Sequence, residues 1–176
     1  HDRGGEGVAA KIRRLAGGTA QVLSGSTPHA EGHETAWAQI VSDRLGYGCV
    51  EVEVLHGDTA VVPLGMDTYG SRSLPIGGTA VWNACQKVLD KARLIAAHTL
   101  GASADDLEED GGTFTAPDGG TMNTKEAALA AWTAHDLPDG MEPGLGALAV
   151  FDPGNFSWPA GTHIAVVEID SETGAV

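Results

Sequence analysis

The sequence is poor in basic residues and in cysteine, and each shortage excludes a class of function. Lys and Arg together number 10 against 24 Asp and Glu, which gives a formal net charge of −14. A surface this acidic repels nucleic acid and anionic lipid, so neither is expected as a direct partner. The two cysteines, Cys49 and Cys85, match no metal-ligand spacing. We therefore expect two small buried side chains rather than a disulfide, in a reducing, cytoplasmic compartment.

Long apolar runs are also missing. No stretch of 18 apolar residues occurs, so no membrane-inserted helix is expected. The N-terminal residues lack the apolar core of a secretory signal. With 176 residues, 42% of them apolar, the chain is long enough to bury the core of a single domain, 1–176. It begins at His1 and its last strand pattern ends in a turn, so we expect a piece of a longer polypeptide.

Hydrophobic periodicity predicts short strands mixed with three helices. Strands are predicted for a hairpin at 8–24 that turns at Gly17 and Gly18, for 50–55, within 103–116, and for 162–169. Helices are predicted for 33–45, 79–100 and 124–135, and long irregular segments for 56–78 and 136–161. The order indicates an α+β fold, a two-layer sandwich in which about three helices pack on a mixed or antiparallel sheet.

Local signals support the three helices. Apolar residues recur at helical spacing in the first two, and these are Trp37, Ile40, Val41 and Leu45, then Val81, Cys85, Val88, Ala92 and Ile95. The third helix starts with Asn123 followed three residues later by Glu126, a capping-box pattern. The apolar stripes predict that one face of each of the first two helices packs against a common core.

Residues 28–35, PHAEGHET, raise the question of a metal site. His29 and His33 stand four apart, and on one helical face the two could hold zinc. However, Gly32 would cost about 1 kcal/mol inside a helix, and Glu31 is not placed as in the H-E-x-x-H motif. No third ligand is evident, so we assign no metal ligand.

An anion-binding loop fits the same stretch better. A glycine-containing loop that runs into a helix presents free backbone N–H groups and the positive end of the helix dipole. A second stretch, MDTYGSRS at 66–73, also precedes a helix, and its hydroxyls and Arg72 can bind phosphate oxygens. The alternatives are an ordinary helix start, and a structural loop in which Arg72 pairs with a surface acid.

Catalytic patterns are weak. No G-x-S-x-G motif occurs, and neither cysteine has a histidine partner nearby in the sequence. His56 and Asp58 could form an acid–base pair, although a turn at a strand end is the commoner explanation. The carboxylates at 105–110 are most simply a solvated acidic turn. We assign no catalytic residue.

Three longer stretches, which cover nearly the whole chain in order, resemble a known family. They are SGSTPHAEGHETAWAQIVSDRLG (24–46), VEVLHGDTAVVPLGMDTYGSRS (52–73) and FDPGNFSWPAGTHIAVVEIDSETGAV (151–176). They are similar to the large, molybdopterin-binding subunit of molybdenum hydroxylases, the family of xanthine dehydrogenase and aerobic carbon monoxide dehydrogenase.

The resemblance implies that two loops help to hold a molybdenum–pterin dinucleotide of the cytosine type. It assigns to this cofactor the residues Glu31, Gly32, His33, Glu34, Thr35, Thr68, Tyr69, Gly70, Ser71, Arg72 and Ser73, and His29 also matches. The chain departs from the pattern at Ala30, where the family carries Gly, and at Glu31, where it carries Gln. An ionised Glu31 repels a pyrophosphate, so it is either protonated, or turned away, or an obstacle to binding.

The resemblance also implies partners. The intact enzyme would hydroxylate a carbon centre or oxidise a small molecule, and would pass electrons to iron–sulfur and flavin subunits. The family's metal-proximal loop and catalytic glutamate find no match in this chain, which would contribute cofactor-binding loops to the remainder of the large subunit and be inactive alone. The alternative is a self-contained, non-enzymatic acidic binding module.

Overall fold

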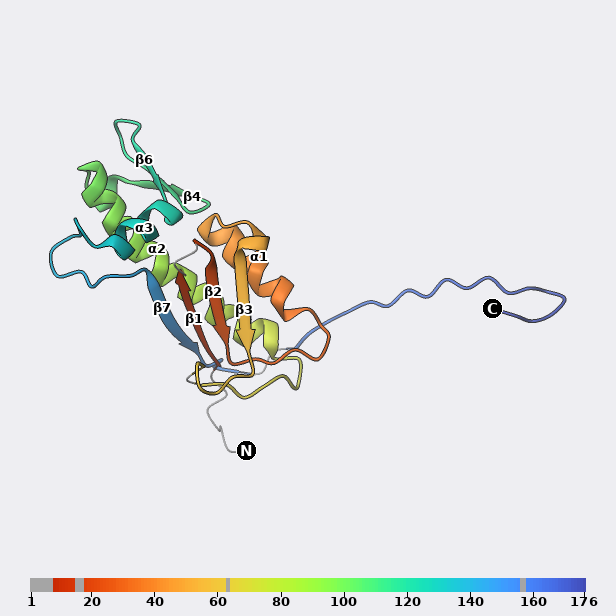
Figure 1. Ribbon diagram of the computed structural model, residues 1–176. Helices are drawn as coiled ribbons and strands as arrows, with labels where there is room; N and C mark the ends of the chain where they lie inside the picture. Colours follow the sequence, from red (N-terminus) through yellow and green to blue (C-terminus); the bar gives the residue numbers. More distant parts are fainter. Residues whose placement is uncertain (1–7, 15–17, 63, 156–157) are drawn as a thin grey trace.

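A computed structural model describes residues 8–14, 18–62, 64–155 and 158–176 (Figure 1). The strands are β1 (Val8–Arg14), β2 (Ala20–Ser24), β3 (Val52–His56), β4 (Glu108–Asp110), β5 (Thr113–Thr115), β6 (Thr121–Asn123) and β7 (Gly146–Phe151). The α-helices are α1 (His33–Leu45), α2 (Thr79–Leu100) and α3 (Thr124–Thr133). The α+β class is confirmed, with the strands divided between two sheets.

The larger sheet has the strand order β3-β2-β1-β7. β1 runs antiparallel to both β2 and β7, whereas β2 and β3 are parallel and are joined through α1. A parallel pair needs such a crossover because its two strands start at the same end of the sheet. Figure 1 shows α1 and α2 behind one face of this sheet. α2 packs on β1 and β7, and α1 packs on β3 and α2.

The main core lies between this sheet and the two long helices. The predicted stripe of α2 is buried along its whole length, from Val81 to Ile95. On α1, Trp37, Val41 and Leu45 are buried, while Ile40 is partly exposed. Both helices begin and end where the sequence predicts. None of the helices among the described residues has the length and apolar character needed to cross a bilayer.

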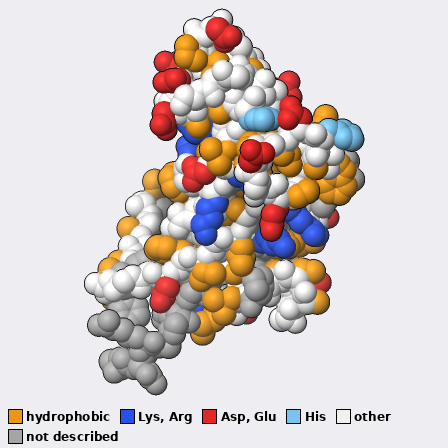
Figure 2. All heavy atoms as spheres, turned by 90° about the vertical axis from the view of Figure 1, so that its left-hand side faces the viewer, with side chains coloured by type: hydrophobic (Ala, Val, Ile, Leu, Met, Phe, Trp, Pro, Cys, Tyr) orange, Lys and Arg blue, Asp and Glu red, His pale blue; other side chains and the backbone are white. Residues whose placement is uncertain are grey.

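The smaller sheet, β4-β5-β6, lies beside α3. Phe114 of β5 is fully buried. The capping box at the start of α3 is confirmed, because the Glu126 N–H donates to Asn123 Oδ1 at 3.0 Å and the Asn123 N–H donates to the Glu126 carboxylate at 2.8 Å. Acidic side chains gather on the upper end of the molecule (Figure 2), where Figure 1 places β4 and β6. Asp105, Asp106, Glu108 and Asp110 are exposed, so the acidic segment is solvated as predicted, although its second half forms β4 rather than a turn.

The last third of the chain departs from prediction. The segment 136–161 is not one irregular loop, because β7 lies within it and pairs with β1. The segment 162–169 forms no strand and extends away from the body as an exposed tail (Figure 1). Its apolar alternation resembles that of a strand, but a strand also needs a neighbour to accept its backbone hydrogen bonds. In β7 small apolar residues alternate with larger apolar ones. The sequence therefore lacks the alternation of apolar and polar residues that predicts a strand.

Smaller corrections concern single positions. Cys49 is exposed rather than buried, because it begins a 3₁₀ turn that delays the start of β3 to Val52. Cys85 is buried in α2, and both thiols are free. In the first hairpin, Gly18 has the expected positive φ of 93°, whereas Gly17 lies outside the described residues.

Two glycines allow two segments to cross at the end of the larger sheet. The Gly25 N–H donates to Ala9 O and the Ala9 N–H donates to Leu64 O, both at 3.1 Å. A Cβ on Gly25 would lie 2.3 Å from Leu64 O, and one on Gly65 would lie 2.4 Å from Gly25 O. Both atoms met are backbone atoms, so no side-chain rotation relieves the clash. The crossing therefore requires glycine on each side.

We expect Gly65→Ala to lower the free energy of unfolding by about 1–3 kcal/mol, the usual cost of overpacking. Gly161→Ala is the matched control, since a Cβ there meets nothing within 4 Å. Urea denaturation followed by circular dichroism would measure both variants. If Gly65→Ala and Gly161→Ala had equal free energies of unfolding, the two backbone segments could move apart without loss of stability, which would contradict this expectation.

Candidate functional site

The two predicted anion loops come together in the structure. One loop, 25–32, follows β2, and the other, 57–72, follows β3. Because β2 and β3 are parallel, both loops leave the larger sheet at the same end. The Asp67 N–H donates to Gly25 O at 3.3 Å, and His29 Nε2 lies 3.7 Å from Asp67 Oδ1. Ligands of sheets with parallel strands commonly bind at the carboxyl ends of the strands.

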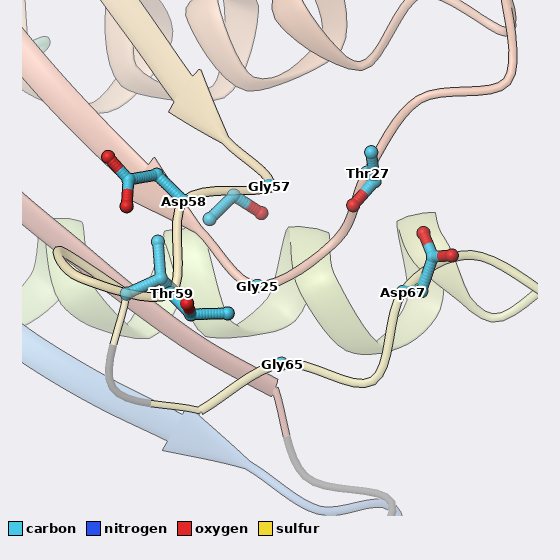
Figure 3. A pocket seen from close by; sticks show the side chains of 9 residues that line it. Gly25, Thr27, Gly57, Asp58, Thr59, Gly65 and Asp67 are labelled. Carbon is cyan, nitrogen blue, oxygen red and sulfur yellow. The ribbon is translucent and has the colours of Figure 1, made fainter.

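A cavity of about 250 Å³ opens between the two loops (Figure 3). It is lined by Ser24, Gly25, Thr27, Gly57, Asp58, Thr59, Val62, Gly65 and Asp67. Figure 3 places Asp58 and Asp67 at opposite ends of it, with Thr27 facing Asp67. None of the residues assigned to the cofactor from the sequence lines this cavity. The parallel pairing of β2 with β3 could have revealed the lining residues, but the sequence does not predict that pairing.

The start of α1 excludes the helical zinc arrangement. Gly32 is the N-cap residue and is left-handed, with φ 80° and ψ 40°, so His29 lies before the helix and does not share a face with His33. Across the described residues, no group of three or more His, Cys, Asp or Glu is placed to hold a metal ion. No side chain caps α1. Apart from the Glu34 N–H, which faces its own carboxylate, the first backbone N–H groups of α1 therefore remain available to an anion.

His33, the first residue of α1, is a buried polar group without a hydrogen bond. Its side chain is 4% exposed and stacks on Trp37, with ring centroids 5.1 Å apart. Nε2 is in ion-pair contact with Glu31 Oε1 at 2.7 Å, but neither ring nitrogen makes a hydrogen bond among the described residues. Ser26 Oγ and Trp37 Nε1 are likewise buried without a partner. Unsatisfied buried groups cost about 1–3 kcal/mol each and usually mark a missing ligand or water.

Glu31 is turned back onto its own loop. Its Oε2 accepts the His29 N–H at 2.5 Å, and its Oε1 faces His33. Desolvation raises the pKa of Glu31, but the backbone N–H groups of Glu31 and His29 and the charges of His33 and His29 outweigh it. The pKa therefore lies below its ordinary value of 4.5. The Glu31 carboxylate in this structure is therefore ionised at neutral pH.

The second loop holds its polar groups in an ordered turn. Thr68 Oγ1 and Ser73 Oγ share a hydrogen bond of 2.7 Å. Arg72 is buried, donates from Nη1 to the Tyr69 hydroxyl at 2.7 Å, and lies over the Tyr69 ring. Arg72 is thus packed within the loop rather than exposed at the surface. Ser71 has a positive φ of 57°, a conformation that residues other than glycine rarely adopt.

Asp67 is tied to both loops. The Thr68 N–H lowers the pKa of Asp67, desolvation raises it, and the Thr27 hydroxyl and the charge of His29 lower it further, so that the pKa falls below its ordinary value. The carboxylate is therefore ionised at neutral pH. It links the loop after β3 to the loop after β2.

His56 pairs with Glu34 and not with Asp58. His56 Nε2 lies 2.7 Å from Glu34 Oε1, which joins the end of β3 to the first turn of α1. Asp58 Oδ1 accepts the Ala60 N–H at 2.8 Å in a turn. The predicted acid–base pair is therefore wrong, and the alternative of a strand-end turn is correct for Asp58.

The residues at this junction fit a phosphate-bearing group. Among the described residues, no side chain caps the start of α1 and the buried ring of His33 makes no hydrogen bond, so both offer contacts to an anion. The cavity between the loops, here called the cradle, is lined in part by Gly25 and Gly65, whose close backbone approach holds the two loops together. The carboxylates of Glu31 and Asp67 oppose an anion, but Glu31 is held by donors of its own loop and Asp67 by donors of both loops.

Comparison with known proteins gives concordant matches. The sequence model of a family described as "Molybdopterin cofactor-binding domain" matches residues 2–176. The carbon monoxide dehydrogenase large chain of Hydrogenophaga pseudoflava is 41% identical over 165 residues, covering 93% of this chain and 20% of that protein. The large chain from Afipia carboxidovorans is 36% identical over 167 residues, covering 94% and 20%. This chain thus spans about a fifth of the length of these relatives.

A solved structure agrees with the sequence matches. The chain is similar to the reconstituted CO dehydrogenase from Oligotropha carboxidovorans, with a TM-score of 0.78 and 36% sequence identity. The match covers 84% of this chain and 18% of that one.

The strained backbone at Ala30 can be tested by substitution. Ala30 has φ 74°, and a left-handed residue other than glycine costs about 1–2 kcal/mol. We expect Ala30→Gly to raise the free energy of unfolding by up to about 1 kcal/mol, after the larger entropy of the unfolded glycine is subtracted. Ala36→Gly, inside α1, should lower it by about 1 kcal/mol. Urea denaturation would contradict this expectation if both variants were destabilised alike.

The Glu34–His56 contact predicts a dependence of stability on pH. The Glu34 backbone N–H lowers the pKa of Glu34 most, followed by His56, so the folded pKa lies below the ordinary 4.5. The contribution of Glu34 is therefore present above the ordinary pKa and is lost as pH falls through the lowered value.

We expect Glu34→Gln to flatten the fall in unfolding free energy between about pH 5 and pH 3. Glu168→Gln, in the exposed tail, removes the same charge and should keep the wild-type slope. Identical slopes for wild type and both variants would contradict a role for the Glu34–His56 contact.

Proposed function

The chain belongs to the molybdopterin cofactor-binding domain family, and from this premise we propose that the junction of its two strand-end loops holds the phosphates of a molybdenum–pterin dinucleotide. The family places the chain in the cofactor-binding portion of a molybdenum-dependent oxidoreductase large subunit. The proposal concerns which residues meet the cofactor and what each of them does.

One observation carries the proposal, namely the buried imidazole of His33 at the start of α1. Its ring nitrogens make no hydrogen bond among the described residues, although Glu31 Oε1 lies 2.7 Å from Nε2. A histidine that is 96% buried would ordinarily satisfy its ring nitrogens within the protein. This one instead lies where the helix dipole favours negative charge. A phosphate oxygen would accept a hydrogen bond from the ring and from the first N–H groups of the helix.

The second loop would complete the contact. The hydroxyls of Thr68, Ser71 and Ser73 can donate to phosphate oxygens, and Arg72 contributes a positive charge beside them. Gly32 and Gly70 keep the backbone near the ligand free of side chains. Tyr69, Glu34 and Thr35 shape the two turns, and we propose no acid–base role for any of these residues. The bound metal supplies the redox chemistry.

We further propose the setting of the intact enzyme. Its relatives include carbon monoxide dehydrogenase large chains, which supports oxidation of a small molecule as the overall activity. The dinucleotide would be of the cytosine type. The remainder of the large subunit, together with iron–sulfur and flavin subunits, would complete a cytoplasmic complex.

The proposal can be tested with His33→Phe in the full-length subunit. Phenylalanine keeps the stacking on Trp37 and removes both ring nitrogens. We expect the molybdenum and pterin that copurify with the subunit to fall at least about tenfold, the usual cost of one or two hydrogen bonds to a charged group. Metal analysis and the fluorescence of the oxidised pterin would measure this content.

His98→Phe is the matched control for this experiment. His98 lies in the last turn of α2 and pairs with Asp136 at 2.8 Å, away from both loops. It should keep the wild-type content of cofactor. Full cofactor content in a folded His33→Phe subunit would contradict the proposed site.

A further inference from the structure

The anion position before α1 is already filled by a side chain of the loop itself. Glu31 accepts backbone N–H groups of Glu31 and His29 on its carboxylate. The same carboxylate lies 2.7 Å from the imidazole of His33. These are the donors that a phosphate in this loop would use. The carboxylate therefore mimics the ligand.

The backbone around Glu31 has the form of an anion nest. Ala30 and Gly32, on either side, are both left-handed, with φ of 74° and 80°. Alternating conformations of this kind turn successive N–H groups toward one point, where an anion binds. The buried ring of His33 points to a ligand independently of this loop geometry. Neither nitrogen makes a hydrogen bond among the described residues, and the contact of Nε2 with Glu31 leaves Nδ1 without a partner among them.

We propose that Glu31 is a built-in competitor for the pyrophosphate of the cofactor, which must displace its carboxylate from the nest and from His33 in order to bind. This inference rests on the proposed function of the same loops. Glu31 is 39% exposed and lies at the surface side of His33, so it can swing into solvent without unfolding α1. The site then has two states, one closed on its own carboxylate and one open to phosphate.

Charge makes the competition strong. A displaced carboxylate that stays near the loop would repel the incoming phosphates, and Glu34 and Asp67 lie on the adjacent segments. Glutamine has the same shape but neither the charge nor two acceptor oxygens. Its amide would release the backbone N–H groups more readily and could donate to a phosphate oxygen.

The test is the binding of inorganic pyrophosphate to the 176-residue chain, measured by calorimetry and by amide chemical shifts. We expect Glu31→Gln and Glu31→Ala to bind at least about tenfold more tightly than wild type, the effect of removing one charged hydrogen-bond partner. The amide proton of His29 should move upfield in both variants and return downfield when pyrophosphate binds.

Glu109→Gln is the matched control. Glu109 also accepts a backbone N–H, from Gly112 at 2.9 Å, but in the smaller sheet, and its substitution changes the net charge equally. It should bind pyrophosphate as wild type does, within about twofold, because surface charges at this distance are screened. An equal gain in Glu109→Gln would attribute the effect to net charge and overturn the inference.

Two further outcomes separate this inference from the proposed function. Equal, measurable binding by wild type and both Glu31 variants would overturn the competitor role and leave the phosphate site intact. No binding by any of the variants would show that the loop is not an anion site, and both proposals would fail. The His29 amide shift also reports whether the carboxylate leaves the nest in each case.

Discussion

The parallel pairing of β2 with β3 is the constraint on which the site depends. With Ala20 opposite Val52 and Ser24 opposite His56, both strands end at the same edge of the sheet. The loops that follow them, 25–32 and 57–72, are then neighbours, although the 24 residues 33–56 separate them in sequence. The crossover helix α1 follows from the same pairing, and its uncapped N-terminus points its free N–H groups at that edge. Every contact proposed for a phosphate comes from this arrangement.

The binding of an anion by so acidic a chain depends on local donors rather than on overall charge. The formal net charge is −14, and long-range attraction would favour cations. Backbone N–H groups, a helix dipole and one buried guanidinium act over a few ångströms, where the distant acids are largely screened. The acids nearest the site are held by their own partners, as Glu34 is by His56 and Asp67 by Thr27 and Thr68. The carboxylates of Glu34 and Asp67 are thus fixed in position, whereas the Glu31 carboxylate is turned onto the N–H groups of the first loop.

Structural features that depend on residues close together in the sequence could be predicted from the sequence. The limits of α1 and α2 and the capping box of α3 follow from periodicity and from residues within one helical turn. Partners distant in sequence were not predictable. The pairing of β7 with β1 joins Val8 to Phe151, the exposure of Cys49 depends on where β3 begins, and the partner of His56, at the end of β3, comes from helix α1. The two loops could be named from their composition, whereas the cavity between them required the strand order.

The crossing of Gly25 and Gly65 has a consequence for how the two loops can vary. Because the segments touch backbone to backbone, the distance between the two loops is set by the main chain and does not depend on side-chain rotamers. Residues around the cradle can then be exchanged without altering its width. A change such as glutamate for glutamine at position 31 alters what the cradle accepts while its dimensions are kept. The backbone crossing thus sets the geometry of the site, whereas side chains such as that of residue 31 set which ligand it binds.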